Sequence, residues 1–283
     1  MAALGPFEDM MRREDGRIDL AHACLLVAQD AYPALDVDHY MAELERMAAR
    51  LRARTPNATA AEEKVIALNQ FLYEDLGYSG NAGDYYDPRN SYLNEVMERR
   101  TGIPITLAIV YMEVGRRIGL PLEGVSFPGH FLVRVPMRRG MLVLDAFEGG
   151  LPQSEDELRE RLKRVLPRGA TGSVPPEDLP LEQFLEPASN RQILGRLLRN
   201  LKGIFREKDE PGRLLEVLNR MLLVAPDAHA ELRDRGLVYE RLECWRPALQ
   251  DLRDYTEREP EAPDADDIRA RVIELSQLCA RLN

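Results

Sequence analysis

The 283-residue chain has few cysteines, fewer basic than acidic residues and no long hydrophobic run. Its three cysteines, Cys24, Cys244 and Cys279, lie far apart and form no C-x-x-C pair, so we expect neither a disulfide framework nor a cysteine metal cluster. Apolar runs such as Cys24–Ala28 and Leu107–Met112 fall well short of the roughly 20 residues that span a bilayer. We therefore expect reduced thiols, no bound metal and no membrane association.

The charge balance excludes a general nucleic-acid binder. Thirty-eight basic residues stand against 48 acidic ones, which gives a formal net charge of −10, whereas affinity for nucleic acid depends on clustered lysine and arginine. The one local basic run, Arg159–Arg168, is interpreted as a solvated helix face. The opening residues, MAALGPFEDMMRREDGR, carry acidic groups where a secretory signal has a basic end and an apolar stretch. We expect a cytoplasmic protein.

Composition and periodicity predict a folded chain with three parts. Hydrophobic residues make up 45% and charged residues 30%, as in soluble globular proteins, and the length favours more than one domain. Apolar residues recur at helical spacing over residues 17–55 and 60–76. We predict a helical N-terminal lobe over residues 1–59, a core over residues 60–187 and a repeat tail over residues 188–283.

The core contains the clearest helix and a change of period. The helix is predicted over residues 104–118, because Pro104 suits a first helical turn and Gly119 with Pro121 ends it. Short β-branched or aromatic runs follow, separated by turns, and predict a small antiparallel meander. The runs are Gly124–Ser126, His130–Val135 and Met141–Asp145.

The C-terminal third repeats itself every 34 residues, with Gly236 placed before Tyr239. This spacing matches the tetratricopeptide pattern of two packed helices per repeat, and residues 266–281 predict a helix that caps the stack. The matched pairs are Leu198 and Leu232, Phe205 and Tyr239, Leu214 and Ala248, Leu218 and Leu252, Met221 and Tyr255, and Pro226 and Pro260.

Three features of the core occur in an informative order: a helix opening at Pro104, a strand carrying His130 and a strand ending at Asp145. The order resembles the transglutaminase-like core of papain-type cysteine hydrolases. In that core a helix N-terminus presents the nucleophilic cysteine, the next strand presents the histidine base, and the following strand presents the aspartate that orients the histidine. A helix N-terminus lowers a thiol pKa, and a carboxylate fixes the imidazole tautomer. The resemblance implies a retained pair of His130 and Asp145.

The detailed match is to the SirB family of transglutaminase-like proteins. It is carried by SYLNEVMERRTGIPITLAIVYMEVGRRIGLPL at residues 91–122, FPGHFLVRV at residues 127–135 and LDAFEGG at residues 144–150, followed by the two repeats. The resemblance covers nearly the whole chain and implies an α+β fold. It predicts a helical N-terminal lobe, a transglutaminase-like (papain-type) core with a small antiparallel sheet, and an α-helical tetratricopeptide tail.

The chain departs from the enzymatic pattern at the nucleophile. Aligning Ala108 and residues 119–121 with the transglutaminase helix places Pro104 where the cysteine belongs. Proline has no nucleophile and no backbone N–H, which such sites use as an oxyanion donor, and none of the cysteines lies in this block. Thr106 is the nearest hydroxyl but points away around the helix. Ser126 precedes His130 across a short turn, and alternate residues on a strand share a face, which can bring the two side chains close together. Ser126 is therefore the alternative nucleophile.

A further short helix is predicted over residues 90–100, and three polar residues in it have two open interpretations. Asn90, Ser91 and Asn94 either cap that helix or line a pocket beside His130. On the second interpretation they are binding residues together with Pro104 and Ser126.

Two functions are compatible with these residues. The first is a pseudoenzyme without a cofactor, a non-catalytic protein-interaction or regulatory scaffold that binds a protein or peptide through the repeat tail and the core cleft. The alternative is an amide-bond hydrolase or acyl transferase that uses His130 and Asp145 with a non-cysteine nucleophile or an activated water. The first is favoured, because the loss of nucleophile and oxyanion donor in one residue is hard to compensate.

Overall fold

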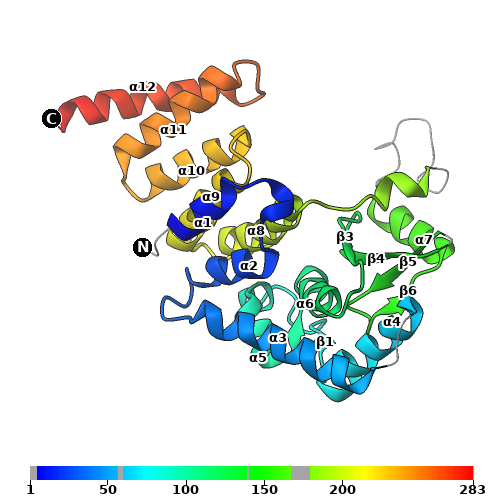
Figure 1. Ribbon diagram of the computed structural model, residues 1–283. Coiled ribbons are helices and arrows are strands. Elements are labelled where there is room, and N and C mark those ends of the chain that lie inside the picture. Colours follow the sequence, from blue (N-terminus) through cyan, green and yellow to red (C-terminus); the bar gives the residue numbers. More distant parts are fainter. Residues whose placement is uncertain (1–4, 57–59, 139, 167–178, 283) are drawn as a thin grey trace. The chain divides into compact units, whose positions relative to one another are not determined.

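The computed structural model describes residues 5–56, 60–138, 140–166 and 179–282. The chain divides into two compact units, which can be followed along the chain in Figure 1. The first unit comprises residues 13–194, and the second comprises residues 3–12 together with residues 195–283. The division into three parts expected from the sequence is a different description and stays a prediction.

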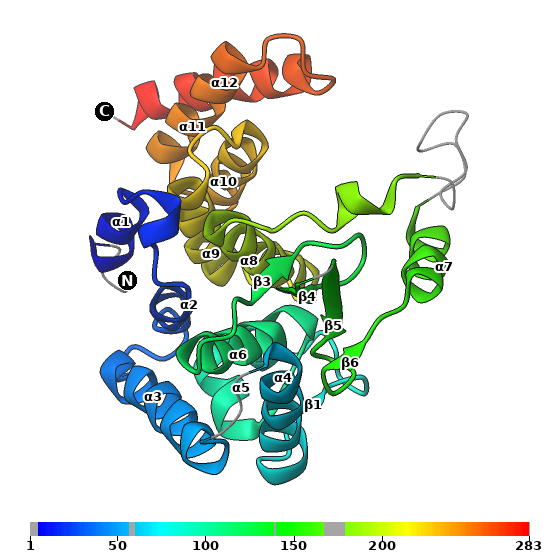
Figure 2. The same ribbon diagram turned by 45° about the vertical axis from the view of Figure 1, so that its right-hand side comes forward.

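A buried central helix organises the first unit. This helix, α6, is buried from Pro104 to Gly115 and contacts helices as well as strands, and Figure 2 shows it between the surrounding helices and the four-stranded sheet. The helices of the unit are α2 (Leu20–Ala28), α3 (Val37–Arg54), α4 (Ala61–Asn69), α5 (Leu93–Arg99), α6 (Pro104–Arg117) and α7 (Glu155–Val165), with shorter helical turns η1 (Asp15–Arg17), η2 (Gln70–Asp75), η3 (Pro88–Ser91) and η5 (Leu181–Phe184).

The sheet of the first unit is an antiparallel meander in the order β3-β4-β5-β6. Its strands are β3 (Glu123–Val125), β4 (Leu132–Pro136), β5 (Met141–Asp145) and β6 (Leu151–Pro152). Pro136 pairs with Met141, so the turn of the central hairpin follows β4. The opposite, open end of this hairpin therefore holds His130, just before β4, and Asp145, the last residue of β5.

A second, two-stranded sheet lies at the start of α6. Strand β1 (Ser79–Gly80) pairs in parallel with β2 (Thr101–Gly102). Because β2 ends two residues before Pro104, this pairing fixes where the chain enters the central helix. A Cβ atom at Gly80 would lie 2.6 Å from the ring of Phe147, so a larger residue there would displace that ring.

The second unit is helical and shows the repeat read from the sequence. Its helices are α1 (Gly5–Met11), α8 (Asn190–Glu207, from Gly195 onward), α9 (Pro211–Val224), α10 (His229–Arg241), α11 (Trp245–Arg258) and α12 (Ala265–Arg281). A Cβ atom at Gly236 would lie 2.6 Å from Leu252, so glycine permits the close packing of α10 on α11. Helix α1 contacts α9, where the guanidinium of Arg220 lies 4.7 Å over the Phe7 ring.

The α+β class, with a small antiparallel sheet and a helical tail, is confirmed. The predicted capping helix is α12, which packs on α11. One helix expected around residues 90–100 is split, because the chain forms the η3 turn before α5 begins. None of the helices in the described part of the chain is long and apolar enough to cross a membrane.

Candidate functional site

The hairpin brings His130 and Asp145 into contact. The Nε2 atom of His130 lies 2.9 Å from Oδ1 of Asp145. The carboxylate is fully buried, whereas 12% of the imidazole side chain is exposed. The geometry follows from the strand register, which places both residues at the open end of the β4–β5 hairpin. One side of the pair is thus anchored in the core, and the other side reaches the surface.

Asp145 has two further donors. The backbone N–H of Phe147 donates to Oδ1 at 3.0 Å, and Nη2 of Arg161, on α7, donates to Oδ2 at 2.6 Å. Burial is the largest influence on Asp145 and opposes its ionisation, but the hydrogen bond and charge of His130 and the charge of Arg161 together lower its pKa. Asp145 is therefore ionised at neutral pH despite its burial.

The ionised carboxylate selects the tautomer of His130. A carboxylate can only accept hydrogen bonds, so Nε2 carries the proton that faces Asp145. A neutral imidazole then presents the lone pair of Nδ1, and the contact with Asp145 is the ring's one polar contact within the described part of the chain. This arrangement is chemically suited to accepting a proton at Nδ1.

The loop after Asp145 is anchored by hydrogen bonds from α4 and η2. The hydroxyl of Tyr73 donates to the carbonyl of Ala146 at 2.8 Å, and Nδ2 of Asn69 donates to the carbonyl of Gly150 at 2.9 Å. Tyr111, on α6, donates to Oδ1 of Asn69 at 2.8 Å. Tyr73 lies in η2, a π-helical turn, a distortion that often occurs at functional sites.

Phe147 connects the pair to the start of α6. Its ring meets that of His130 edge-on, with 6.2 Å between the ring centroids. The same ring covers Gly80, whose strand partner Gly102 lies just before Pro104. We refer to His130, Asp145, Phe147 and Arg161 as the strand half of the site, and to the chain from Gly102 to Thr106 as the helix half.

The helix half offers no nucleophile from its own residues. Pro104 is buried in the first turn of α6. The Thr106 hydroxyl is occupied, because it donates to the carbonyl of Asn90 at 2.7 Å and accepts the N–H of Ile103 at 3.1 Å. Cys24, on α2, is fully buried, and burial together with the charges of Glu113 and Asp19 raises its thiol pKa strongly, so it stays protonated.

The structure separates the three polar residues considered as a cap or a pocket. The cap interpretation is wrong, because the residue before α5 is Tyr92 and no side chain caps that helix. Asn90 instead ties down the preceding loop, where its Nδ2 donates to the carbonyl of Asp84 at 2.7 Å. Ser91 is buried, and Asn94 lines a cavity formed with the α2–α3 turn. Their role as binding residues stays a prediction.

Ser126 lies at the end of β3 and is exposed. It is followed by a turn in which the His130 N–H donates to the carbonyl of Phe127 at 3.1 Å. Gly129 in this turn has φ +68°, and a Cβ atom there would lie 2.6 Å from Val165 at the end of α7. The turn that carries His130 is thereby held against α7, and the role of Ser126 as a nucleophile stays a prediction.

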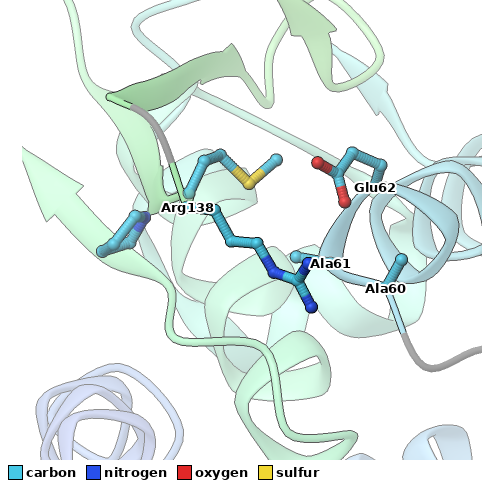
Figure 3. A pocket seen from close by; sticks show the side chains of 6 residues that line it. Ala60, Ala61, Glu62 and Arg138 are labelled. Carbon is cyan, nitrogen blue, oxygen red and sulfur yellow. The ribbon is translucent and has the colours of Figure 1, made fainter.

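A cavity of about 620 Å³ adjoins the strand half. Its wall includes Arg161, which also binds Asp145, together with Gln153 and Arg164 and several acidic side chains of α7. A smaller cavity of about 320 Å³ lies at the other end of the hairpin, beyond Pro136. There Glu62 and Arg138 extend into the same space from opposite walls (Figure 3).

Arg161 and Phe147 belong to the candidate site, and the sequence pattern alone reveals neither. The interpretation of the basic run as a solvated face is wrong for Arg161, because its guanidinium binds a buried carboxylate. A signal is present: Arg161 follows Leu158 by three residues and precedes Leu162, and both leucines are buried. Residues three apart on a helix share a face, so Arg161 lies beside the buried stripe.

Among the described residues no group of three or more His, Cys, Asp or Glu is arranged to hold a metal ion.

Comparison with known proteins identifies both parts of the chain. Residues 38–199 match the transglutaminase-like superfamily, and residues 201–272 match a tetratricopeptide repeat family. A UPF0162 protein of Xylella fastidiosa strain Temecula1 is 43% identical over 93% of this chain and 92% of its own length. The UPF0162 protein YchA of Escherichia coli K12 is 30% identical over 88% of each chain.

Protein SirB1 of Salmonella typhimurium is 28% identical over 81% of this chain and 82% of its own. Among solved structures, menin overlaps with 97% of this chain and 74% of its own at a TM-score of 0.42 and 13% identity, a likeness too low to support an argument. The match from residue 38 to residue 199 and the relatives that extend over most of the chain lead to one conclusion. The chain belongs to the transglutaminase-like superfamily and, within it, to the family of the UPF0162 and SirB1 proteins.

Proposed function

We propose that this chain is a non-catalytic member of its family that acts as a protein-interaction or regulatory scaffold in the cytoplasm. The observation that supports the proposal is the start of α6, where Pro104 is buried in the first turn. Proline supplies neither a nucleophile nor the N–H that would stabilise an oxyanion. The buried thiol of Cys24, with its raised pKa, does not replace what is missing.

The repeat tail is the partner-binding surface in this proposal. Tetratricopeptide arrays use the surfaces formed by their stacked helices to bind other proteins. In this tail a cavity of about 260 Å³ is lined by Arg206, Asp234 and apolar side chains of α9 and α10. Arg206 is 60% exposed and donates to Asp234 at 2.7 Å, so a protein or peptide partner has a charged and an apolar element to contact. The core cleft beside Arg161 is the second contact surface.

The test is cross-linking of the tagged full chain in its native cells, followed by mass spectrometry. Three variants are compared with the wild type: His130→Asn, Arg206→Glu and, as a matched control, Arg258→Glu, which reverses an exposed charge at the end of α11. We expect the same partner set for the wild type, His130→Asn and Arg258→Glu. Arg206→Glu should reduce recovery of that set. A partner set that is insensitive to Arg206→Glu would contradict the assignment of this surface.

A second function is favoured by one observation, the orientation of the His130 ring. Its Nε2 faces Asp145 at 2.9 Å, which makes Nδ1 the basic nitrogen of the neutral ring. A water activated at Nδ1 could attack an amide or ester carbonyl, with the proton passing to His130 and then to the leaving group. The test is a panel of amide and thioester substrates assayed with the wild type and His130→Asn. Turnover that disappears in His130→Asn would overturn the scaffold proposal.

A further inference from the structure

A cavity in the first unit, separate from the His130–Asp145 pair, has an unusual wall. It measures about 810 Å³ and lies between the turn that joins α2 to α3 and one face of α5. Its volume falls within the range of small-ligand sites. Residues 31–40 form one wall, and Asn94, Glu95 and Glu98 form the other. We call it the acidic cavity.

The negative charge of this cavity is not neutralised by its surroundings. Asp36, Glu95 and Glu98 line it, and no lysine or arginine does. Within the described part of the chain, none of these three carboxylates forms an ion pair. Asp36 accepts the N–H of His39 as the cap of α3, and Glu98 accepts the hydroxyl of Tyr40. Both bonds leave the negative charge in place.

Neighbouring acids behave differently. Glu43 and Glu45, also on α3, pair with Arg46 and Arg117 at 2.7 Å, as charged surface groups commonly do. The charge of Glu95 contributes to raising the pKa of Arg89, but the guanidinium of Arg89 forms its ion pair with Asp87, at 2.7 Å. These acids outside the cavity are therefore paired with arginines, whereas the acids that line the cavity are not.

Two further features of the wall point to a ligand that donates hydrogen bonds. Tyr32 and Tyr40 supply aromatic rings, whose faces attract cations. Asn94 lines the cavity at 4% exposure, and its Oδ1 is a buried acceptor without a donor among the described residues. A buried acceptor of this kind is costly unless a donor reaches it, so the wall combines unneutralised carboxylates with an unsatisfied amide oxygen.

We propose that the acidic cavity binds an alkylammonium or guanidinium group, carried by a lysine or arginine side chain of a partner protein. Such groups are cationic and donate hydrogen bonds without accepting any, which complements carboxylates, an amide oxygen and aromatic faces together. A bare metal ion fits less well, because the described residues contain no cluster of ligands arranged around one point. The proposal does not depend on the scaffold function, since a basic segment would bind a catalytic or a non-catalytic protein in the same way.

The experiment measures binding of short peptides to the full chain by calorimetry at low ionic strength. The probe is Ac-Gly-Ser-Arg-Gly-Ser-NH2, and the matched peptide carries citrulline, which has nearly the same shape without the charge. We expect the arginine peptide to bind at least about tenfold more tightly, since hydrogen bonds to charged groups are worth this much or more. Equal binding of the two peptides, or no binding of the arginine peptide, would overturn the proposal.

Variants locate the site and ethylguanidinium identifies the source of the cation. Glu95→Gln and Glu98→Gln should each weaken the arginine peptide by about tenfold. The matched control, Glu62→Gln, changes an exposed glutamate beside the smaller cavity of Figure 3 and should leave binding unchanged. Unchanged binding in both acidic-cavity variants, with thermal unfolding like that of the wild type, would place the peptide elsewhere and reject the site. Ethylguanidinium that binds as tightly as the peptide would overturn the assignment to a protein-borne side chain.

Discussion

The strand half of the site contains a hydrogen-bonded His–Asp pair, whereas the helix half contains no available nucleophile. In the strand half, a buried carboxylate holds His130, Arg161 and a backbone N–H at 2.6–3.0 Å. In the helix half, Pro104 and the occupied hydroxyl of Thr106 leave no reactive group. The ring of Phe147 lies between them, against His130 and Gly80.

The strand half has a structural basis that is independent of any chemistry. The buried Asp145 carboxylate accepts from three donors, so removing it would leave His130 and the Phe147 N–H without a partner and Arg161 with Gln153 alone. Pro104 costs the helix nothing, because the first-turn N–H has no intrahelical acceptor. The hydrogen bonds of the strand half therefore stabilise the fold, whereas the first turn of α6 places no structural demand for a reactive side chain at residue 104. The following predictions test this contrast.

The largest effect is expected from Asp145→Ala. The substitution removes a fully buried carboxylate. It leaves His130 and the Phe147 N–H unpaired, and the Arg161 guanidinium keeps its contact with Gln153 at 3.4 Å. Breaking a buried ion pair from one side typically costs about 3–5 kcal/mol, and the free energy of unfolding should fall by that amount in urea titrations. Asp156→Ala, an exposed acid on α7, is the control and should change stability by less than about 0.5 kcal/mol. Similar values for both variants would show that the pair is not a core element.

Arg161→Gln should have the next largest effect. The Asp145 carboxylate then keeps His130 and the Phe147 N–H but loses the guanidinium at Oδ2, at a cost of about 1–3 kcal/mol. The matched control is Arg164→Gln, on the same helix and lining the same cavity. If both variants have equal stability, Arg161 is a solvated side chain after all, as its sequence context suggests.

A smaller effect is expected from pH. The pKa of Asp145 is lowered in the folded chain relative to its ordinary value of 3.8, so folding favours the ionised form. This contribution is fully present above the unfolded pKa, and it is lost as the pH falls from about 4 through the lower folded pKa. Asp145→Asn should therefore lose less stability between pH 5 and pH 3 than the wild type does. Parallel stability curves for the two proteins would contradict a lowered pKa.

Much of the fold was predictable because its signals are local. The first turn at Pro104, the 34-residue repeat and the strand alternation depend on spacing along the chain, and the contact of His130 with Asp145 follows once the hairpin register is known. The partners Arg161 and Phe147 were not predictable in the same way. They approach Asp145 through the packing of α7 and of the loop after β5, which a single sequence does not encode as a period. The acidic cavity likewise depends on a turn between α2 and α3 meeting α5.

The smallest change in stability is expected from Pro104→Cys, which also tests the comparison most directly. The first helical turn tolerates either residue, so the free energy of unfolding should change by less than about 1 kcal/mol. If the two halves still align as in a papain-type site, the new thiol lies at a helix N-terminus near a base, and both lower its pKa.

The readout is the rate of alkylation by iodoacetamide at neutral pH, followed by mass spectrometry. The thiol introduced by Pro104→Cys should react faster than exposed Cys244, which serves as the internal control in the same molecule. Adding His130→Asn should slow the introduced thiol and leave Cys244 unchanged, because only the first depends on the imidazole. An introduced thiol that ignores His130→Asn would show that the helix half does not place residue 104 beside His130. A fast and His130-dependent thiol would show that the surroundings of residue 104 can still activate a thiol.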